Sequence, residues 1–148
     1  MTKKPATLTY TYAGLVDSIL TPVDIFSGVY DDIDSYLTNA LWDTGAMGSV
    51  ISPKIAKKLN LDVVDTVKID GINGSSLAEV VIASIHFPNG AVIKDLRVAI
   101  CDMSPGNEVI IGMDAISQMD FAITNGGGQT QISFAIPPFN TRIDFSKT

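Results

Sequence analysis

The sequence is poor in residues that hold metals and disulfides, because it has one cysteine, Cys101, and one histidine, His86. A lone cysteine cannot form an intrachain disulfide, and neither residue has a second ligand at the spacing of a zinc site. A catalytic thiol would have His86 as its sole candidate base, so we expect Cys101 to be a small core residue and His86 to be structural. The acidic run DDIDS, residues 31–35, lacks the glycine and distal glutamate of a calcium loop, which favours a solvated turn. We therefore expect no metal and no cofactor.

The sequence also lacks long apolar runs and clusters of basic residues. No run approaches the length of a membrane-spanning helix, so we expect no membrane span. With 10 basic against 16 acidic residues, the formal net charge is −6, which argues against nucleic-acid binding. The opening stretch MTKKPATLTYTYAG has no apolar segment of a signal peptide, so the expected location is the cytoplasm.

The sequence does contain enough apolar residues for one folded domain: 46% of its 148 residues are hydrophobic and 18% are charged. β-Branched and aromatic residues recur in short segments, separated by turn signals such as FPNGAV at residues 87–92, a tight-hairpin sequence. Strands are expected over residues 7–14, 18–28, 35–43, 65–71, 75–87, 90–102, 107–112, 120–125 and 129–136. Two short helices are expected at residues 52–61, where Ser52 is a natural N-cap, and at residues 113–120. This pattern predicts a single mainly-β domain, a barrel or a sandwich.

The stretch ALWDTGAMGSVIS places Asp43, Thr44 and Gly45 at the end of an apolar strand. A carboxylate is costly to desolvate there unless it is paired. Asp43 can cap a β-turn by bonding its own backbone, with Gly45 supplying conformational freedom, or it can be catalytic. A D-T-G tripeptide alone does not separate these two interpretations, and we weigh them equally at this point.

Three segments, taken in order, resemble the retropepsin-like aspartic proteases. Residues 40–61, ALWDTGAMGSVISPKIAKKLNL, resemble the active-site segment of that family. Residues 68–76, KIDGINGSS, resemble its glycine-rich flap, and residues 108–123, EVIIGMDAISQMDFAI, resemble its apolar strand and the helix that follows. The capped helix and the closing hairpin are more similar to cellular and bacterial members than to the compact viral enzymes.

The resemblance implies a single-lobed, closed β-barrel with two short helices. It covers roughly residues 38–136, which we expect to form the core of one domain spanning residues 1–148. Residues 1–37 are then extra amino-terminal strands, and residues 137–148 are a carboxy-terminal tail.

The resemblance also implies peptide hydrolysis by two aspartates that share a proton, one acting as base on a water and the other as acid on the scissile carbonyl. This chain has one D-T-G and is too short for two lobes, so the second aspartate is expected from a second copy in a homodimer. By resemblance, Asp43 is catalytic, the Thr44 hydroxyls cross-link the two loops, and Gly45 lets the substrate backbone approach closely. The expected partners are a second copy of the chain and a peptide or protein substrate.

By the same resemblance, the substrate lies between the D-T-G loop and the flap, and cleavage is expected between apolar side chains. The backbone amide at the flap tip is expected to bind a bridging water. The residues expected to line the substrate site are Leu41, Ala46, Ile69, Gly71, Ile72 and Ile110.

Some positions depart from the familiar viral pattern. Met47 and Met113 stand where the viral enzymes carry an Asp and an Arg that pair near the dimer interface. Loss of both charges leaves no buried charge unpaired, so we expect an apolar contact instead. Asp70 and Asn73 replace flap glycines, which predicts a stiffer flap.

Two other functions remain open on the sequence. A catalytically silent domain of the same fold, used for dimerisation or peptide binding, would keep the same core pattern. The intact D-T-G-A favours the enzyme, because such a module has no reason to retain a carboxylate at an apolar strand end. A carbohydrate-binding β-sandwich is the third possibility, but the aromatic residues form no evident stacking platform.

Overall fold

The structure, a computed structural model, describes residues 3–28 and 34–147. Asp31 and Asp32 of the acidic run lie outside the described residues. The strands are β1 (Ala6–Thr11), β2 (Ile19–Ser27), β3 (Ser35–Trp42), β4 (Val50–Ile51), β5 (Val63–Gly71), β6 (Gly74–His86), β7 (Val92–Ile100), β8 (Val109–Ile111), β9 (Asp120–Thr124) and β10 (Gln131–Ile136). The helices are α1 (Pro53–Lys58) and α2 (Met113–Ile116), with 3-10 turns η1 (Gly126–Gly128) and η2 (Phe145–Lys147).

The larger sheet closes into a barrel-like ring. Its strand order is β2-β3-β8-β4-β7-β6-β5, and β2 also pairs with β6, which joins the two sides of the sheet. The ring therefore runs through β2, β3, β8, β4, β7 and β6. The fold class expected from the sequence is confirmed, since the protein is mainly β and ring-shaped with two short helices.

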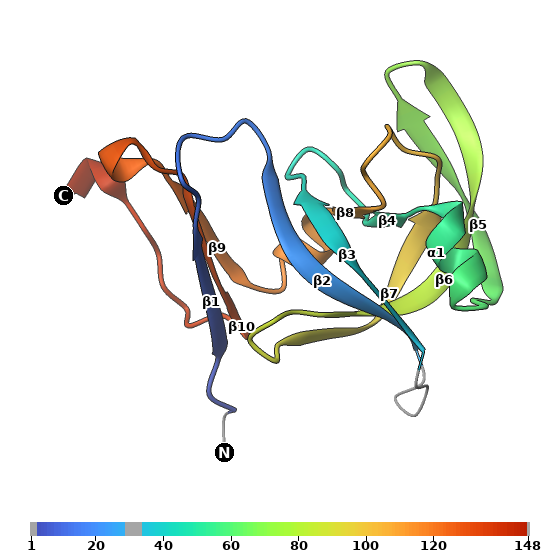
Figure 1. Cartoon of the computed structure of the whole chain (residues 1–148), viewed down its shortest axis with the longest axis horizontal. Helices are drawn as coiled ribbons and strands as arrows, with labels where there is room; N and C mark the ends of the chain where they lie inside the picture. Colours follow the sequence, from blue (N-terminus) through green and yellow to red (C-terminus); the bar gives the residue numbers. More distant parts are fainter. Residues whose placement is uncertain (1–2, 29–33, 148) are drawn as a thin grey trace.

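Strand β5 lies outside this ring and extends it as a hairpin with β6. In Figure 1 this hairpin projects from the top of the molecule, and the turn that follows β3 points the same way. Gly71 pairs with Gly74, so residues 72 and 73 form the tip. Gly74 has a φ of +109°, a conformation that side chains disfavour, and this explains the glycine.

A separate three-stranded sheet has the order β1-β10-β9 and lies at the opposite end of the molecule in Figure 1. Strands β9 and β10 form the antiparallel hairpin expected at the end of the core. Strand β1 adds to the other edge of β10, from Ala6 opposite Ile136 to Thr11 opposite Gln131. The chain's first and last strands are thus paired with each other.

An aromatic cluster around Trp42 joins the ring to the small sheet. The centroid of the Trp42 side-chain ring lies 4.9 Å from that of Phe121 and 5.5 Å from that of Phe134, both on the small sheet, and 5.7 Å from that of Phe87. Its indole N–H donates to the buried Thr21 hydroxyl at 2.9 Å, so the polar atom of this buried side chain is satisfied. This cluster holds the residue immediately before Asp43.

The first helix begins as expected and the second is shorter than expected. The Ser52 hydroxyl accepts the Ile55 N–H, and Pro53 occupies the first helical position of α1. The second helix ends at Ile116 rather than continuing to residue 120, because Asp120 already begins β9 and needs an extended backbone. Ile116, the last residue of α2, and Met119, in the turn that follows, are both buried, so a turn rather than a longer helix brings the two side chains into the core.

Strand β4 was not predicted. It has two residues, which is too short for an alternating pattern, and pairs parallel with β7 and antiparallel with β8. The tail after β10 forms no strand among its described residues. It returns along β9, where the Phe139 N–H donates to the Asp120 carboxylate at 2.7 Å.

Candidate active site

Asp43 lies in a tight loop at the end of β3. Its N–H donates to the Ile111 carbonyl of β8 at 2.9 Å, which places the loop at the end of two parallel strands. Its side-chain Oδ1 accepts the Gly45 N–H at 2.8 Å, and its carbonyl accepts the Ala46 N–H at 3.2 Å. Asp43 thus bonds its own loop backbone as the turn interpretation expected, but Gly45 has no positive φ, so the glycine is not explained by backbone conformation. The catalytic interpretation stays open, because one carboxylate oxygen is enough to close the turn.

The Asp43 loop is docked on the start of α2 by backbone hydrogen bonds. The Met113 N–H donates to the Ala46 carbonyl at 2.8 Å, and the Asp114 N–H donates to the Met47 carbonyl at 3.0 Å. A helix start has N–H groups without intrahelical partners, and the loop carbonyls satisfy them. The approach is so close that a Cβ on Gly112 would lie 2.7 Å from the Gly48 carbonyl oxygen. The glycine before α2 is therefore required by space.

Ser49 and Asp114 form a hydrogen-bond network that the sequence did not predict. The Asp114 carboxylate accepts both the Ser49 N–H at 3.0 Å and the Ser49 hydroxyl at 2.7 Å. The same hydroxyl accepts the Gly112 N–H at 3.0 Å. Ser49 is buried, so each of its polar groups needs such a partner. This network holds the carboxy-terminal end of the Asp43 loop, at Ser49, against α2.

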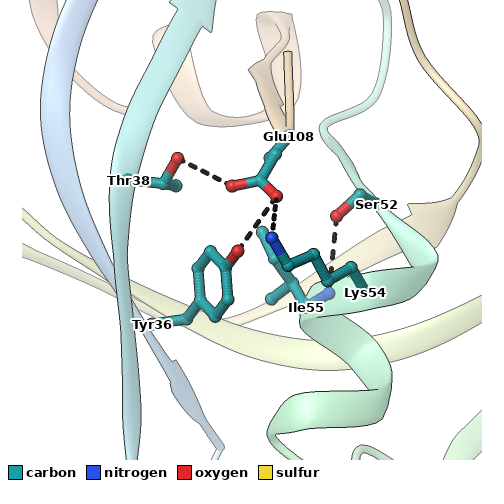
Figure 2. Close-up of polar contacts among 6 residues, drawn as sticks. All are labelled: Tyr36, Thr38, Ser52, Lys54, Ile55 and Glu108. Atoms are coloured by element: carbon teal, nitrogen blue, oxygen red, sulfur yellow. Dashed lines mark hydrogen bonds and ion pairs between the residues drawn. The ribbon is translucent and has the colours of Figure 1, made fainter. Parts of the chain in front are cut away.

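Glu108 anchors the strand that carries Ile110. Figure 2 shows its carboxylate between β3 and α1, where it accepts the Tyr36 hydroxyl at 2.9 Å and the Thr38 hydroxyl at 3.1 Å, and lies 3.5 Å from Lys54 Nζ. Its carbonyl accepts the Ser52 N–H at 2.8 Å. Burial raises the pKa of Glu108, but the hydrogen bonds from the two hydroxyls and the charge of Lys54 outweigh it and hold that pKa below its usual value.

The β5–β6 hairpin covers a cavity of about 400 Å³ next to the Asp43 loop. Gly45, Ala46 and the rest of the loop through Ser49 form one wall. The hairpin contributes Ile69 and its neighbours, and the outer face of the ring forms the floor. Two of the expected substrate residues, Ala46 and Ile69, are thus brought together although they come from different elements.

A second cavity, of about 450 Å³, is lined by Asp43 itself. Asp43 and Leu41 line it together with Ile123 and the loop of residues 16–18. The buried Thr130 builds this loop, since its hydroxyl accepts the Val16 N–H at 3.1 Å and donates to Asn125 at 2.7 Å. The sequence offered no signal for Thr130, because its partners lie on segments that are distant along the chain.

The remaining expected site residues lie near these cavities but do not line them in the described structure. Ile110 is half-buried between Leu41 of β3 and Val50 of β4, its neighbours in the sheet. Gly71 and Ile72 are at the hairpin tip, where Ile72 is fully exposed at 105%. Thr44 is exposed in the Asp43 loop.

The two residues that could have supported other chemistry have structural surroundings. Cys101 is half-buried and is not part of the core, which corrects the expectation from the sequence. Burial, followed by the nearby Asp102 charge, raises the pKa of its thiol, which disfavours a reactive thiolate. The His86 ring packs 4.2 Å from Phe26. Within residues 3–28 and 34–147, no three His, Cys, Asp or Glu side chains are grouped so as to hold a metal ion. In the same residues, no helix is long and apolar enough to cross a membrane.

A profile of the family described as "Aspartyl protease" matches residues 32–115, which is more than half of the chain and includes the Asp43 loop, α1 and the start of α2. The chain belongs to the aspartyl protease family. Among curated protein sequences, no individual relative matches it.

Solved structures agree with this membership at the level of the fold. The retropepsin-like aspartic protease from Rickettsia conorii superposes with a TM-score of 0.57 at 14% identity, over 92% of this chain and 98% of its own. The EIAV protease, solved with the inhibitor HBY-793, superposes with a TM-score of 0.53 at 24% identity, over 72% of this chain and 90% of its own. The resemblance to retropepsin-like aspartic proteases is confirmed. This family member has the single-lobed architecture in one chain.

Proposed function

We propose that the chain is an aspartic endopeptidase whose active site is completed by two copies of Asp43 in a two-fold homodimer. The observation that carries the proposal is the placement of Asp43, which is half-buried in a loop docked on α2 and lines one cavity, while the loop from Gly45 onward lines another. A loop that only closed a turn would need neither cavity.

In the proposed mechanism, one proton is shared by the two Asp43 carboxyls. The ionised carboxylate takes a proton from a bound water, and the protonated one donates to the scissile carbonyl as the water attacks. The Thr44 hydroxyl steadies the pair of loops, and Gly45 leaves room for the substrate backbone. Rates are expected to fall at low pH, where no base remains, and at high pH, where no acid remains.

The surface around the loop supports the dimer. Met47 is 90% exposed, Met113 is exposed beside it at the start of α2, and Ile72 projects from the hairpin tip. Met47 and Met113 adjoin, because the loop carbonyls of Ala46 and Met47 accept the N–H groups of Met113 and Asp114, and contiguous exposed apolar surface marks an interaction site. In the proposed dimer, Met47 and Met113 replace a charged pair by an apolar contact, and the hairpin acts as the flap that covers the substrate.

We further propose that the peptide is cleaved between apolar side chains, that Leu41, Ala46, Ile69 and Ile110 are among the residues lining the whole substrate site, and that the Ile72 amide binds a bridging water. A digest of a peptide library by the protein at a concentration where it is dimeric tests this. Preferred cleavage directly beside lysine or arginine would contradict the assignment.

The decisive variant is Asp43→Asn, which keeps the shape of the side chain but can serve neither as base nor as proton-sharing acid. We expect peptide cleavage to fall by roughly 10²–10⁴-fold or more, as is typical for loss of a general acid–base group. Because the variant also removes repulsion between two carboxylates at the axis, its dimer at pH 7 should be at least as stable as the parent dimer. The control is Asp62→Asn, since Asp62 is an exposed residue outside the Asp43 loop.

The same experiment distinguishes the endopeptidase from a catalytically silent module for dimerisation or peptide binding. A parent protein that forms the dimer and binds peptides but cleaves none would support the module. Cleavage that survives intact in Asp43→Asn would refute the catalytic assignment.

A further inference from the structure

The cavity under the β5–β6 hairpin has an apolar floor. Val50 of β4 and Val80 of β6 both lie opposite Ala99 of β7, so the three side chains are neighbours across the sheet. Val80 is 3% exposed and Ala99 is 9% exposed. Such a floor suits the aliphatic part of a bound side chain.

The rim of this cavity is charged, in contrast to its floor. Lys68, Asp70 and Arg97 line it, so its described lining has a net charge of +1 in a chain whose net charge is −6. The negative charge of Asp70 is balanced locally, because its carboxylate accepts the Ser75 hydroxyl and lies 3.9 Å from Lys68 Nζ. Lys68 and Asp70 thus form one ion pair on the rim, and Arg97 is the remaining cation of the lining, with its own partner Asp65 on β5.

Arg97 is placed to reach both the floor and the rim. It lies two residues before Ala99 on β7, and residues two apart on a strand face the same side. One guanidinium nitrogen lies 2.5 Å from the Asp65 carboxylate of β5, which does not itself line the cavity. A guanidinium has several further N–H donors, so Arg97 can bind a second carboxylate while the Asp65 contact persists.

The cavity lined by Asp43 itself has only acidic residues among its described charged lining. Its charged lining residues in the described structure are Asp17 and Asp43, with no lysine or arginine among them. An acidic side chain is thus disfavoured there, whereas under the hairpin the remaining N–H donors of Arg97 offer it a hydrogen-bonding partner. The two cavities impose different charge preferences at different substrate positions.

We propose that Arg97 is a specificity-determining residue that selects a glutamate side chain at a substrate position that does not adjoin the scissile bond. The proposal rests on the proposed endopeptidase function. The cavity is lined by Gly45 and the loop after it rather than by Asp43, which places its occupant away from the reacting carbonyl. The methylenes of the glutamate contact the Val50 and Val80 floor, and its carboxylate accepts from Arg97.

The experiment uses short peptides that share a central Leu-Phe bond and carry Glu, Gln or Leu at each other position in turn. At one position, we expect the parent to prefer Glu over Gln about fivefold in kcat/KM, as for a partly exposed charge-assisted contact. In Arg97→Gln that ratio should fall to about one, whereas Arg97→Lys should keep part of it. Lys94→Gln is the matched control, because Lys94 is an exposed cation on the same strand that does not line the cavity.

The same peptides are also titrated into the Asp43→Asn variant, with binding followed by fluorescence anisotropy. This measurement reports the preference without cleavage. If the variant binds Glu peptides preferentially but the parent cleaves no peptide, the endopeptidase proposal is refuted and the role of Arg97 in selecting glutamate is retained. Cleavage by the parent with no Glu preference at any position, or with a preference that Arg97→Gln retains, would overturn the role of Arg97 alone.

Discussion

Gly112 lies at the closest contact between the Asp43 loop and the start of α2. An added Cβ would meet three backbone atoms of the loop within 3 Å, the nearest being the Gly48 carbonyl oxygen at 2.7 Å. Backbone atoms cannot rotate away as a side-chain end can, so the loop itself would have to shift. The same shift would move Asp43, because its N–H is bonded to Ile111, the residue before Gly112.

We therefore predict that Gly112→Ala lowers the free energy of unfolding by about 1–3 kcal/mol, the usual cost of overpacking a close contact. The measurement is urea unfolding at fixed protein concentration. Gly126→Ala is the control, since a Cβ at Gly126 would meet nothing within 4 Å and the residue has no positive φ. Equal stabilities of the two variants would show that the loop can yield at no cost.

At the scale of elements, Glu108 ties β8 to β3 and to the start of α1. Its partners Tyr36 and Thr38 lie about seventy residues earlier on β3, so the contact closes one side of the ring. Lys54 is largely exposed, and its ion pair with Glu108 adds little by itself. The two hydroxyl donors are the contacts that hold the carboxylate.

This contact gives the fold an acid sensitivity that can be measured. The pKa of Glu108 is lower in the folded protein than its usual value of 4.5. Its contribution to stability is therefore present above the unfolded pKa and is lost as the pH falls through the folded pKa. We predict that Glu108→Gln lowers the free energy of unfolding by roughly 1–2 kcal/mol at neutral pH, and by less in acid.

Urea unfolding at a series of pH values checks this prediction. The control is Glu79→Gln, because Glu79 is an exposed glutamate on β6. If the gap between parent and Glu108→Gln stays constant down to about pH 3, below the usual range of glutamate, the carboxylate charge contributes nothing.

At the scale of the whole molecule, the exposed methionines are the residues through which the proposed dimer can be tested. The side chain of Met47 is 90% exposed, although its backbone carbonyl is fixed by the Asp114 N–H at 3.0 Å. In the proposed dimer it is buried near the two-fold axis. Burial of such a side chain stabilises association by about 1.5–3 kcal/mol.

We predict that Met47→Lys raises the dissociation constant of the dimer at least about tenfold, because it loses this burial and sets two like charges near the axis. Sedimentation equilibrium measures the constant. Leu37→Lys is the control, since Leu37 is an exposed apolar residue of β3 outside the Asp43 loop. Indistinguishable constants for the two variants would place the interface elsewhere, and a strictly monomeric parent would remove the dimer.

Local patterns in the sequence were enough to predict the fold class, most of the strands, the N-cap at Ser52 and the tight hairpin at residues 87–92. These features depend on alternation, capping and turn geometry, which act over a few residues. The D-T-G segment and the two segments that follow it were enough for the family. The single D-T-G predicts a second copy, but how two Asp43 loops meet depends on packing between two chains, which no local pattern records.

Tertiary structure decided the features in which distant residues meet. Ser49 pairs with Asp114 across 65 positions, and Glu108 with Tyr36 across 72. Strand β4 exists only because β7 and β8 flank its two residues, and α2 stops at Ile116 because β9 must begin. Arg97 likewise lines a cavity, rather than lying on an open strand, only because the β5–β6 hairpin folds over it. A one-dimensional pattern records the period of a strand and the cap of a helix, but side-chain partners are chosen by packing in three dimensions.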